Sequence, residues 1–344
     1  MIKVRPATVV ITVVAVLFVL VLAAITMVGW QVVLGPDARP TSPEPFEVTD
    51  ARLERGRYLV ESVTTCFHCH TEHDLTTPEF PIIQSKKGAG WIMPIPELNH
   101  IASRNITPDR ETGIGDWTDD EVARAIREGV RRDGTALFPI MPYQTYAALS
   151  DEDVKSIVVY LRTIPAVRNV VPTRALPGPL EYLVNTMPKP VTAPVPAPPS
   201  ATARERGEYL VALAECGGCH TPTDEQGVQL PGLAFAGGVM FEDPSRNATP
   251  VFSMNITPAP SGIAHYDESL FMQTLRTGQV GARQLTHIMP FEFFRNMTDQ
   301  DLSDIFAHLR TLEPKAHRVS NVDPSTPCAV CGQPHGLGEM NVKR

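Results

Sequence analysis

One short motif occurs twice in this chain and constrains its fold more than any other feature. Residues 66–70 read Cys-Phe-His-Cys-His, and residues 216–220 read Cys-Gly-Gly-Cys-His. The spacing C-x-x-C-H is typical of covalent haem attachment, in which both cysteine sulfurs bond to the macrocycle and the adjacent histidine reaches the iron. An isolated C-x-x-C is as often a disulfide, a redox pair or half of a zinc site. Two copies in matching surroundings favour two covalently bound haem c groups.

The sequence around the two motifs repeats as well. Glu-Arg-Gly and Tyr-Leu-Val triplets precede each motif, and an Asn-Ile-Thr-Pro tetrapeptide follows it, at residues 105–108 and again at residues 255–258. This tetrapeptide is either a turn or a segment that reaches the haem propionates. Repetition of one set per half predicts two copies of a single module.

Each half is predicted to be mainly helical. Hydrophobic spacing and capping residues predict helices over residues 51–63, 118–130, 150–163, 203–214, 267–277 and 298–311. Ser150 and Thr298, each followed by acidic residues, are the N-cap signals of the last helix in each half. Segments 71–115 and 221–264 are rich in Pro, Gly and Asn, and we expect them to be long loops around the haem.

A methionine in each half is the candidate for the second axial ligand of the iron. Met141 and Met289 each precede a proline and lie just before the last helix of their half. A methionine is by default a core side chain, but a matched pair beside haem motifs favours the Met/His ligation of electron carriers. Met93, also followed by proline, is a weaker candidate because its counterpart Met240 lacks one.

The candidate haem-binding residues are therefore Cys66, Cys69, His70, Met141, Cys216, Cys219, His220 and Met289. Of these, His70, Met141, His220 and Met289 would be the axial ligands of the iron atoms. His68 lies inside the first motif, where the second has Gly218, and is expected to be an incidental exposed side chain. Six further histidines have no counterpart in the other half, so each is expected to be solvated or packed: His73, His100, His265, His287, His308 and His317.

The N-terminus carries a long uncharged stretch. Residues 7–34 contain no charged side chain, and as a helix they would run ~42 Å, enough to cross a bilayer. Lys3 and Arg5 precede the stretch, which predicts a cytoplasmic N-terminus. A cleaved signal peptide is the alternative, but the apolar run is long for one. We therefore expect a single-pass protein of the bacterial inner membrane with its haem modules in the periplasm and lipid among its partners.

Six segments follow from these patterns. They are an N-terminal transmembrane anchor (1–36), a tether (37–50), a first module (51–165), a Pro-rich linker (166–202), a second module (203–314) and a C-terminal tail with a Cys-x-x-Cys (315–344). The linker reads as extended polyproline, either a semi-rigid spacer or a strap along the surface. In the tail, Cys328 and Cys331 are expected to form a disulfide in an oxidising compartment, or to bind a metal with His335.

The order of helix, C-x-x-C-H, loops, methionine and last helix resembles the class I cytochromes c. The Asn-Ile-Thr-Pro segments, Gly113-Ile114-Gly115, the Met-Pro-aromatic turns and the closing Leu-Arg-Thr are similar to the cytochrome c subunits of membrane-bound alcohol, aldehyde and gluconate dehydrogenases. Those subunits usually carry three such modules, whereas this chain has two. The resemblance implies two tandem class I cytochrome c modules, with His70–Met141 and His220–Met289 as axial pairs.

The predicted function is the relay of single electrons. The expected donor is a dehydrogenase or a quinol-oxidising complex, and the expected acceptor is a terminal oxidase, another cytochrome or a photosynthetic centre. The net charge of −8 argues against nucleic acid as a partner. The alternatives are a dihaem peroxidase-type enzyme with one open iron, and a structural or sensory haem subunit of a respiratory complex.

Overall fold

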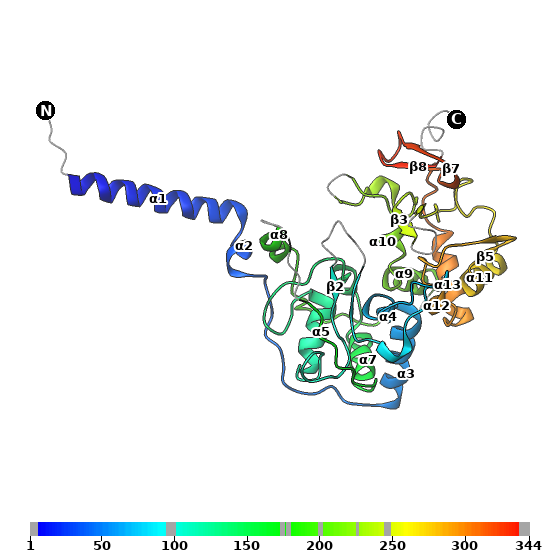
Figure 1. Ribbon diagram of the computed structural model, residues 1–344, viewed down its shortest axis with the longest axis horizontal. Helices are drawn as coiled ribbons and strands as arrows, with labels where there is room; N and C mark the ends of the chain where they lie inside the picture. The colour runs from blue at the N-terminus through cyan, green and yellow to red at the C-terminus, as the bar shows by residue number, and fades with distance from the viewer. Residues whose placement is uncertain are drawn as a thin grey trace.

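The computed structural model describes residues 6–93, 101–172, 176, 180–198, 202–224, 227–243 and 249–336. Within these ranges, the side chains of residues 6–10, 27–28, 33 and 181 are not described. The chain is mainly helical, with four short antiparallel hairpins among the described residues. Figure 1 shows the helices of the two halves packed into one body, from which the N-terminal helix projects.

The first half contains α3 (Asp50–Tyr58), η1 (Leu59–Val63), α4 (Cys66–His70), η2 (Gln84–Lys86), β1 (Trp91–Ile92), β2 (Ala102–Ser103), α5 (Asp119–Glu128), α6 (Tyr143–Tyr146) and α7 (Asp151–Leu161). The linker contains α8 (Leu180–Leu183) and η4 (Val184–Thr186). The second half contains α9 (Ala203–Leu213), α10 (Cys216–His220), η5 (Pro231–Leu233), β3 (Met240–Asp243), β4 (Thr249–Phe252), α11 (Glu268–Thr277), β5 (Gln279–Val280), β6 (Arg283–Gln284), α12 (Phe291–Phe294) and α13 (Asp299–Leu309). The tail forms β7 (Ser320–Pro327) and β8 (Pro334–Gly336).

The N-terminal segment forms α1 (Pro6–Val28) and α2 (Trp30–Leu34). No helix among the described residues combines the length and the apolar character needed to cross a lipid bilayer. On this finding, the predicted transmembrane anchor over residues 1–36 is wrong. So is the single-pass location in the bacterial inner membrane that followed from it.

The predicted helices of the two modules all form, and the predicted caps hold them. The Ser150 hydroxyl accepts a hydrogen bond from the Asp153 amide at 3.0 Å, and Thr298 does the same for Asp301 at 3.1 Å. Each of these caps satisfies a backbone donor that the first turn of a helix leaves unpaired. The loop predictions missed hairpins β1–β2 and β3–β4. Strands of two to four residues give no run of alternating side chains by which a sequence would reveal them.

In each module, the helix that leads into the motif crosses the last helix at a glycine. A Cβ on Gly56 would lie 1.9 Å from the Ser156 carbonyl oxygen, and a Cβ on Gly207 would lie 1.8 Å from that of Asp304. No side chain fits in that space, so glycine is required for this close approach of two backbones. Ion pairs flank the crossings, Arg55 with Asp153 at 2.8 Å and Arg206 with Asp304 at 2.6 Å.

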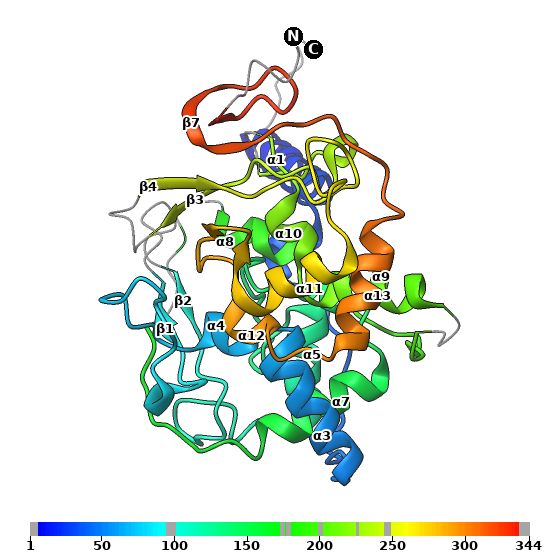
Figure 2. The ribbon, with the colours of Figure 1, turned by 90° about the vertical axis from the view of Figure 1, so that its right-hand side faces the viewer.

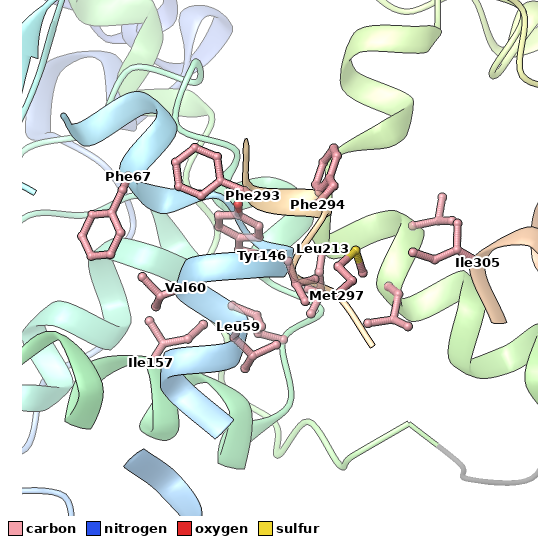
Figure 3. Close-up of a cluster of buried hydrophobic side chains, with 14 of the residues drawn as sticks. Leu59, Val60, Phe67, Tyr146, Ile157, Leu213, Phe293, Phe294, Met297 and Ile305 are labelled. Atoms are coloured by element: carbon pink, nitrogen blue, oxygen red, sulfur yellow. The ribbon is translucent and has the colours of Figure 1, made fainter. Parts of the chain in front are cut away.

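The two modules share one hydrophobic core. A single buried cluster joins Leu59, Val60 and Ile157 of the first module to Leu213 and Phe294 of the second, as Figure 3 shows. The contacts between the modules are reciprocal, because α12 packs on η1 and α6 packs on α9. In Figure 2, α12 lies next to α4, the helix of the first motif.

The described part of the linker lies on the surface of the first module, as the strap alternative predicted. The Asn169 side-chain amide donates to the carbonyl oxygens of Ala89 and Gly90 at 2.9 and 3.0 Å. Further along, the Asp151 amide donates to the Val195 carbonyl at 2.9 Å. Residues 173–175, 177–179 and 199–201 of the predicted linker lie outside the described residues.

The glycine crossings give a direct test of the fold. We expect Gly56→Ala and Gly207→Ala each to lower the free energy of unfolding by about 1–3 kcal/mol, because the added methyl group would force the two helices apart. Thermal unfolding of the full chain measures this effect. Gly232→Ala is the matched control, because its Cβ would meet no atom within 4 Å. Equal stability of all three variants would contradict the assigned crossings.

Candidate functional site

Each motif occupies a short helix that starts from a strained residue. Helices α4 and α10 begin at the first cysteine and end at the histidine of the motif. The preceding residues, Thr65 and Glu215, are in the left-handed region with φ of 46° and 55°. Residues other than glycine rarely adopt this conformation, and such strain concentrates at functional sites. The same backbone turn therefore presents both motifs.

The motif histidines are held in the same way in both modules. The Nδ1 atom of His70 lies 2.7 Å from the Arg104 carbonyl oxygen, and that of His220 lies 2.6 Å from the Met254 carbonyl oxygen. A carbonyl oxygen only accepts, so Nδ1 carries the proton and Nε2 is left with its lone pair. Hydrogen bonding of this kind orients metal-binding histidines. Burial lowers the pKa of both rings, which favours the neutral, ligating form.

A glycine under each motif histidine allows the following loop to approach. The Gly90 amide donates to the His70 carbonyl at 2.8 Å, and the Gly237 amide donates to the His220 carbonyl at 2.7 Å. Both glycines have positive φ, 76° and 71°. A Cβ on Gly90 would lie 2.6 Å from the Ser103 carbonyl oxygen, so the loop closes over the histidine only with glycine here.

The motif cysteines line the same cavity as the histidines. Desolvation by the surrounding protein raises the pKa of Cys66 and Cys219 to about 11 and that of Cys69 and Cys216 to about 12. The Cys219 thiol contributes to the raised pKa of Cys69, so the two attachment sites lie close enough to interact electrostatically. Burial in this apolar environment therefore disfavours the thiolate form of all four cysteines.

Met141 and Met289 occupy matching turns on the cavity wall. The Tyr143 amide donates to the Met141 carbonyl at 2.8 Å, and the Phe291 amide donates to the Met289 carbonyl at 2.7 Å. The aromatic residue after each turn is buried against the glycine that ends the preceding helix. A Cβ on Gly129 would lie 2.6 Å from the Tyr143 ring. These contacts fix the two methionine turns relative to the core.

The cavity is continuous between the modules and has a volume of about 1690 Å³. An ordinary small-molecule pocket has ~300–1,000 Å³, so this space is large enough for more than one bulky ligand. Its lining is mostly apolar and includes all eight predicted haem-binding residues. Met93, the weaker candidate, also lines it, as does Met254. Thiols, oriented imidazoles and an apolar cavity of this size fit covalently bound haem.

One tyrosine of each module forms hydrogen bonds with the start of the last helix of the other module; we call this pair of contacts the tyrosine exchange. The Tyr209 hydroxyl donates to the Asp153 carboxylate at 2.8 Å and accepts from the Ser150 amide at 3.0 Å, at the start of α7. The Tyr58 hydroxyl does the same at the start of α13, where it meets the Asp301 carboxylate and the Thr298 amide. Burial, with Asp301 beside it, raises the pKa of Tyr58 to about 12. Nothing in the sequence pairs these tyrosines with the opposite module.

The Asn-Ile-Thr-Pro segments are turns. The Asn105 side-chain oxygen accepts from the Thr107 amide at 2.9 Å, and Asn255 accepts from Thr257 at 2.9 Å. Each asparagine also donates to a carbonyl beyond the last helix of its module, Asn105 to Val167 at 2.8 Å. Of the unmatched histidines, His68 is packed against Phe293 with 6.0 Å between ring centres. His317, expected to be solvated or packed, instead lies in a cluster with Cys328, Cys331 and His335.

Comparison with known proteins gives several relatives that are named as cytochromes. The family model described as cytochrome c oxidase, cbb3-type, subunit III matches residues 51–161. The fructose dehydrogenase cytochrome subunit of Gluconobacter japonicus is 31% identical over 302 residues, which are 83% of this chain and 57% of that protein. The gluconate 2-dehydrogenase cytochrome c subunit of Pantoea cypripedii is 27% identical over 285 residues, 78% of this chain and 61% of that protein.

A shorter relative matches over most of its own length. The dihaem cytochrome c-type protein of Cereibacter sphaeroides is 32% identical over 224 residues, which are 64% of this chain and 72% of that protein. By contrast, the chain spans only 57% and 61% of the length of the two dehydrogenase cytochrome subunits.

The tyrosine exchange allows a test of how much the contacts between the modules stabilise the fold. We expect Tyr58→Phe and Tyr209→Phe each to lower the free energy of unfolding by about 1.5–3 kcal/mol, because each loses a hydrogen bond to a carboxylate. Thermal unfolding of the full chain is the measurement. Tyr182→Phe is the control, because Tyr182 is exposed. If all three variants unfold at the wild-type temperature, the hydroxyl contacts do not hold the modules together.

Proposed function

Because this chain belongs to the cytochrome c family, whose members carry covalently bound haem c, we propose that it relays single electrons through two haems. One haem would be attached at Cys66 and Cys69, the other at Cys216 and Cys219. The carrying observation is the matched pair of sites on one cavity, each with a buried histidine held through Nδ1 by a backbone carbonyl. The relatives are named as cytochrome subunits, which makes the chain an electron-transfer protein rather than the catalyst.

The axial ligands in this proposal are His70 with Met141 and His220 with Met289. Haem c supplies an iron that accepts and releases one electron, and methionine opposite histidine raises its potential. The protein's part is to orient the imidazoles through the Arg104 and Met254 carbonyls. Packing of Met141 and Met289 against the buried core would hold the two methionines in place. A fixed ligand set keeps the structural change on electron transfer small.

We further propose that the electron donor is a dehydrogenase. The relatives carry fructose, gluconate and alcohol dehydrogenase names, which supports a donor of this class. Electrons would leave to an oxidase or another cytochrome. The net charge of −8 would steer the chain towards a basic surface on such a partner.

Optical spectra of the purified protein, oxidised and reduced, with and without carbon monoxide, test the proposal. We expect two low-spin haems per chain, a weak far-red band from methionine–iron ligation, and no change on adding carbon monoxide, because both axial positions are filled. A high-spin haem that binds carbon monoxide would overturn the relay in that module and favour a peroxidase-type enzyme.

Methionine variants test the ligand assignment. We expect Met141→Ala and Met289→Ala each to remove about half of the far-red band, to lower one reduction potential and to open one iron to carbon monoxide. Redox titration followed by carbon monoxide binding measures all three effects.

Met240→Ala is the control for the methionine variants, because Met240 is exposed on β3. Met93→Ala tests the competing candidate. If Met93→Ala opens an iron and Met141→Ala does not, Met93 is the ligand in the first module.

A further inference from the structure

Four metal-binding side chains meet in the C-terminal tail, apart from the haem motifs. They are His317, Cys328, Cys331 and His335, all buried, and one ligand atom of each lies within 4.8 Å of the others. The structure holds both cysteines as thiols. None of the four lines the large cavity. Two sulfurs and two imidazole nitrogens at this separation form the donor set of a closed, four-coordinate metal site.

The two histidines face each other through ring nitrogens that both carry lone pairs. Their Nε2 atoms lie 3.0 Å apart. The Nδ1 atoms meet carbonyl oxygens, His317 that of Ala236 at 2.9 Å and His335 that of Gly336 at 3.0 Å. Because carbonyls only accept, Nδ1 is the protonated nitrogen in each neutral ring, and the two Nε2 lone pairs point at each other. A cation bound between the two nitrogens would relieve this repulsion.

The spacing of the donors fits one tetrahedral ion. With metal–nitrogen bonds of about 2.0 Å and metal–sulfur bonds of about 2.3 Å, a tetrahedral zinc ion holds nitrogen and sulfur about 3.5 Å apart. The Cys328 sulfur lies 3.6 Å from His317 Nε2. A two-iron cluster with this donor set places histidines and cysteines on different irons, which would hold sulfur and nitrogen much farther apart. The distances therefore favour a single ion.

The backbone of the tail brings the four ligands together. The Gly332 amide donates to the Cys328 carbonyl at 2.8 Å, with φ of 77° at Gly332, so the cysteines lie in one tight turn. The Val330 amide donates to the Cys328 sulfur at 3.4 Å, a contact that stabilises a thiolate. Pairing of Thr326 with His335 in β7–β8 places His335 beside this turn.

We propose that His317, Cys328, Cys331 and His335 bind one structural zinc ion. The ion joins the tail to the second module, because His317 is hydrogen-bonded to the Ala236 carbonyl and His335 packs on Phe252 with 6.2 Å between ring centres. A Cβ on Gly238 would lie 2.9 Å from the His317 ring, so the loop leaves room for this ring only because residue 238 is a glycine. Phe252 also lines the large cavity, so the ion stabilises part of that wall.

Metal analysis and zinc-edge X-ray absorption of the purified full chain, with its haems, test the proposal. The haem absorption bands do not affect either measurement. After dialysis against metal-free buffer, we expect one zinc per two haem irons, with two sulfurs at about 2.3 Å and two nitrogens at about 2.0 Å from it. Cys328→Ser, Cys331→Ser, His317→Gln and His335→Gln should lose the zinc.

Val330→Ala is the matched control and should keep the zinc, because Val330 lies between the cysteines without contributing a ligand atom. Should the ligand variants not fold, thiol labelling of the wild type decides. Both tail cysteines should resist labelling until a chelator removes the zinc. Three results would each overturn the proposal: a zinc-free wild type whose tail cysteines are joined in a disulfide, a zinc-free wild type whose tail thiols label readily, and zinc bound without sulfur ligands.

Discussion

The close crossing of two helices at a glycine determines the geometry of each module. Helix α3 runs through η1 directly into the first motif, and α7 begins directly after the Met141 turn and α6. Where these helices cross therefore sets how far the motif histidine lies from the methionine. At Gly56 the backbones are so close that no side chain could intervene, and sliding either helix by one residue would bring a side chain into the contact. The second module repeats this constraint at Gly207.

The shared core makes the two proposed haem sites parts of one rigid body. Tyr58 and Tyr209 each reach across to cap the last helix of the opposite module. The same helix starts are already capped within their own module by Thr298 and Ser150. Each last helix is thus fixed both by its own module and by its neighbour. The distance between the two proposed sites is therefore set by these contacts and the shared core, and not by the Pro-rich linker.

Local features of the fold could be predicted from the sequence, whereas features that depend on both modules could not. The helices, the caps at Ser150 and Thr298 and the eight candidate haem-binding residues follow from short-range patterns whose physics is local. The tyrosine exchange, the carbonyl that orients each histidine and the hairpin β3–β4 depend on residues far apart in the chain. The anchor over residues 1–36 was predicted from hydropathy alone, and the structure does not bear it out. The position of His317 beside Cys328, Cys331 and His335 also depends on the folding of the tail, and no local sequence pattern predicts it.

The contrast between the modules explains why a histidine at position 317 is informative. In the first module, the Asn169 side-chain amide donates to the Ala89 carbonyl at 2.9 Å. This hydrogen bond ties the chain after the last helix to the loop that follows the first motif. In the second, His317 Nδ1 makes the corresponding bond to Ala236 at the same distance of 2.9 Å. One donor is enough for this purpose, and an asparagine supplies it. The imidazole has a second nitrogen, Nε2, which lies 3.6 Å from the Cys328 sulfur. A side chain that serves the common structural role while presenting an additional ligand is expected where the tail is secured to the module.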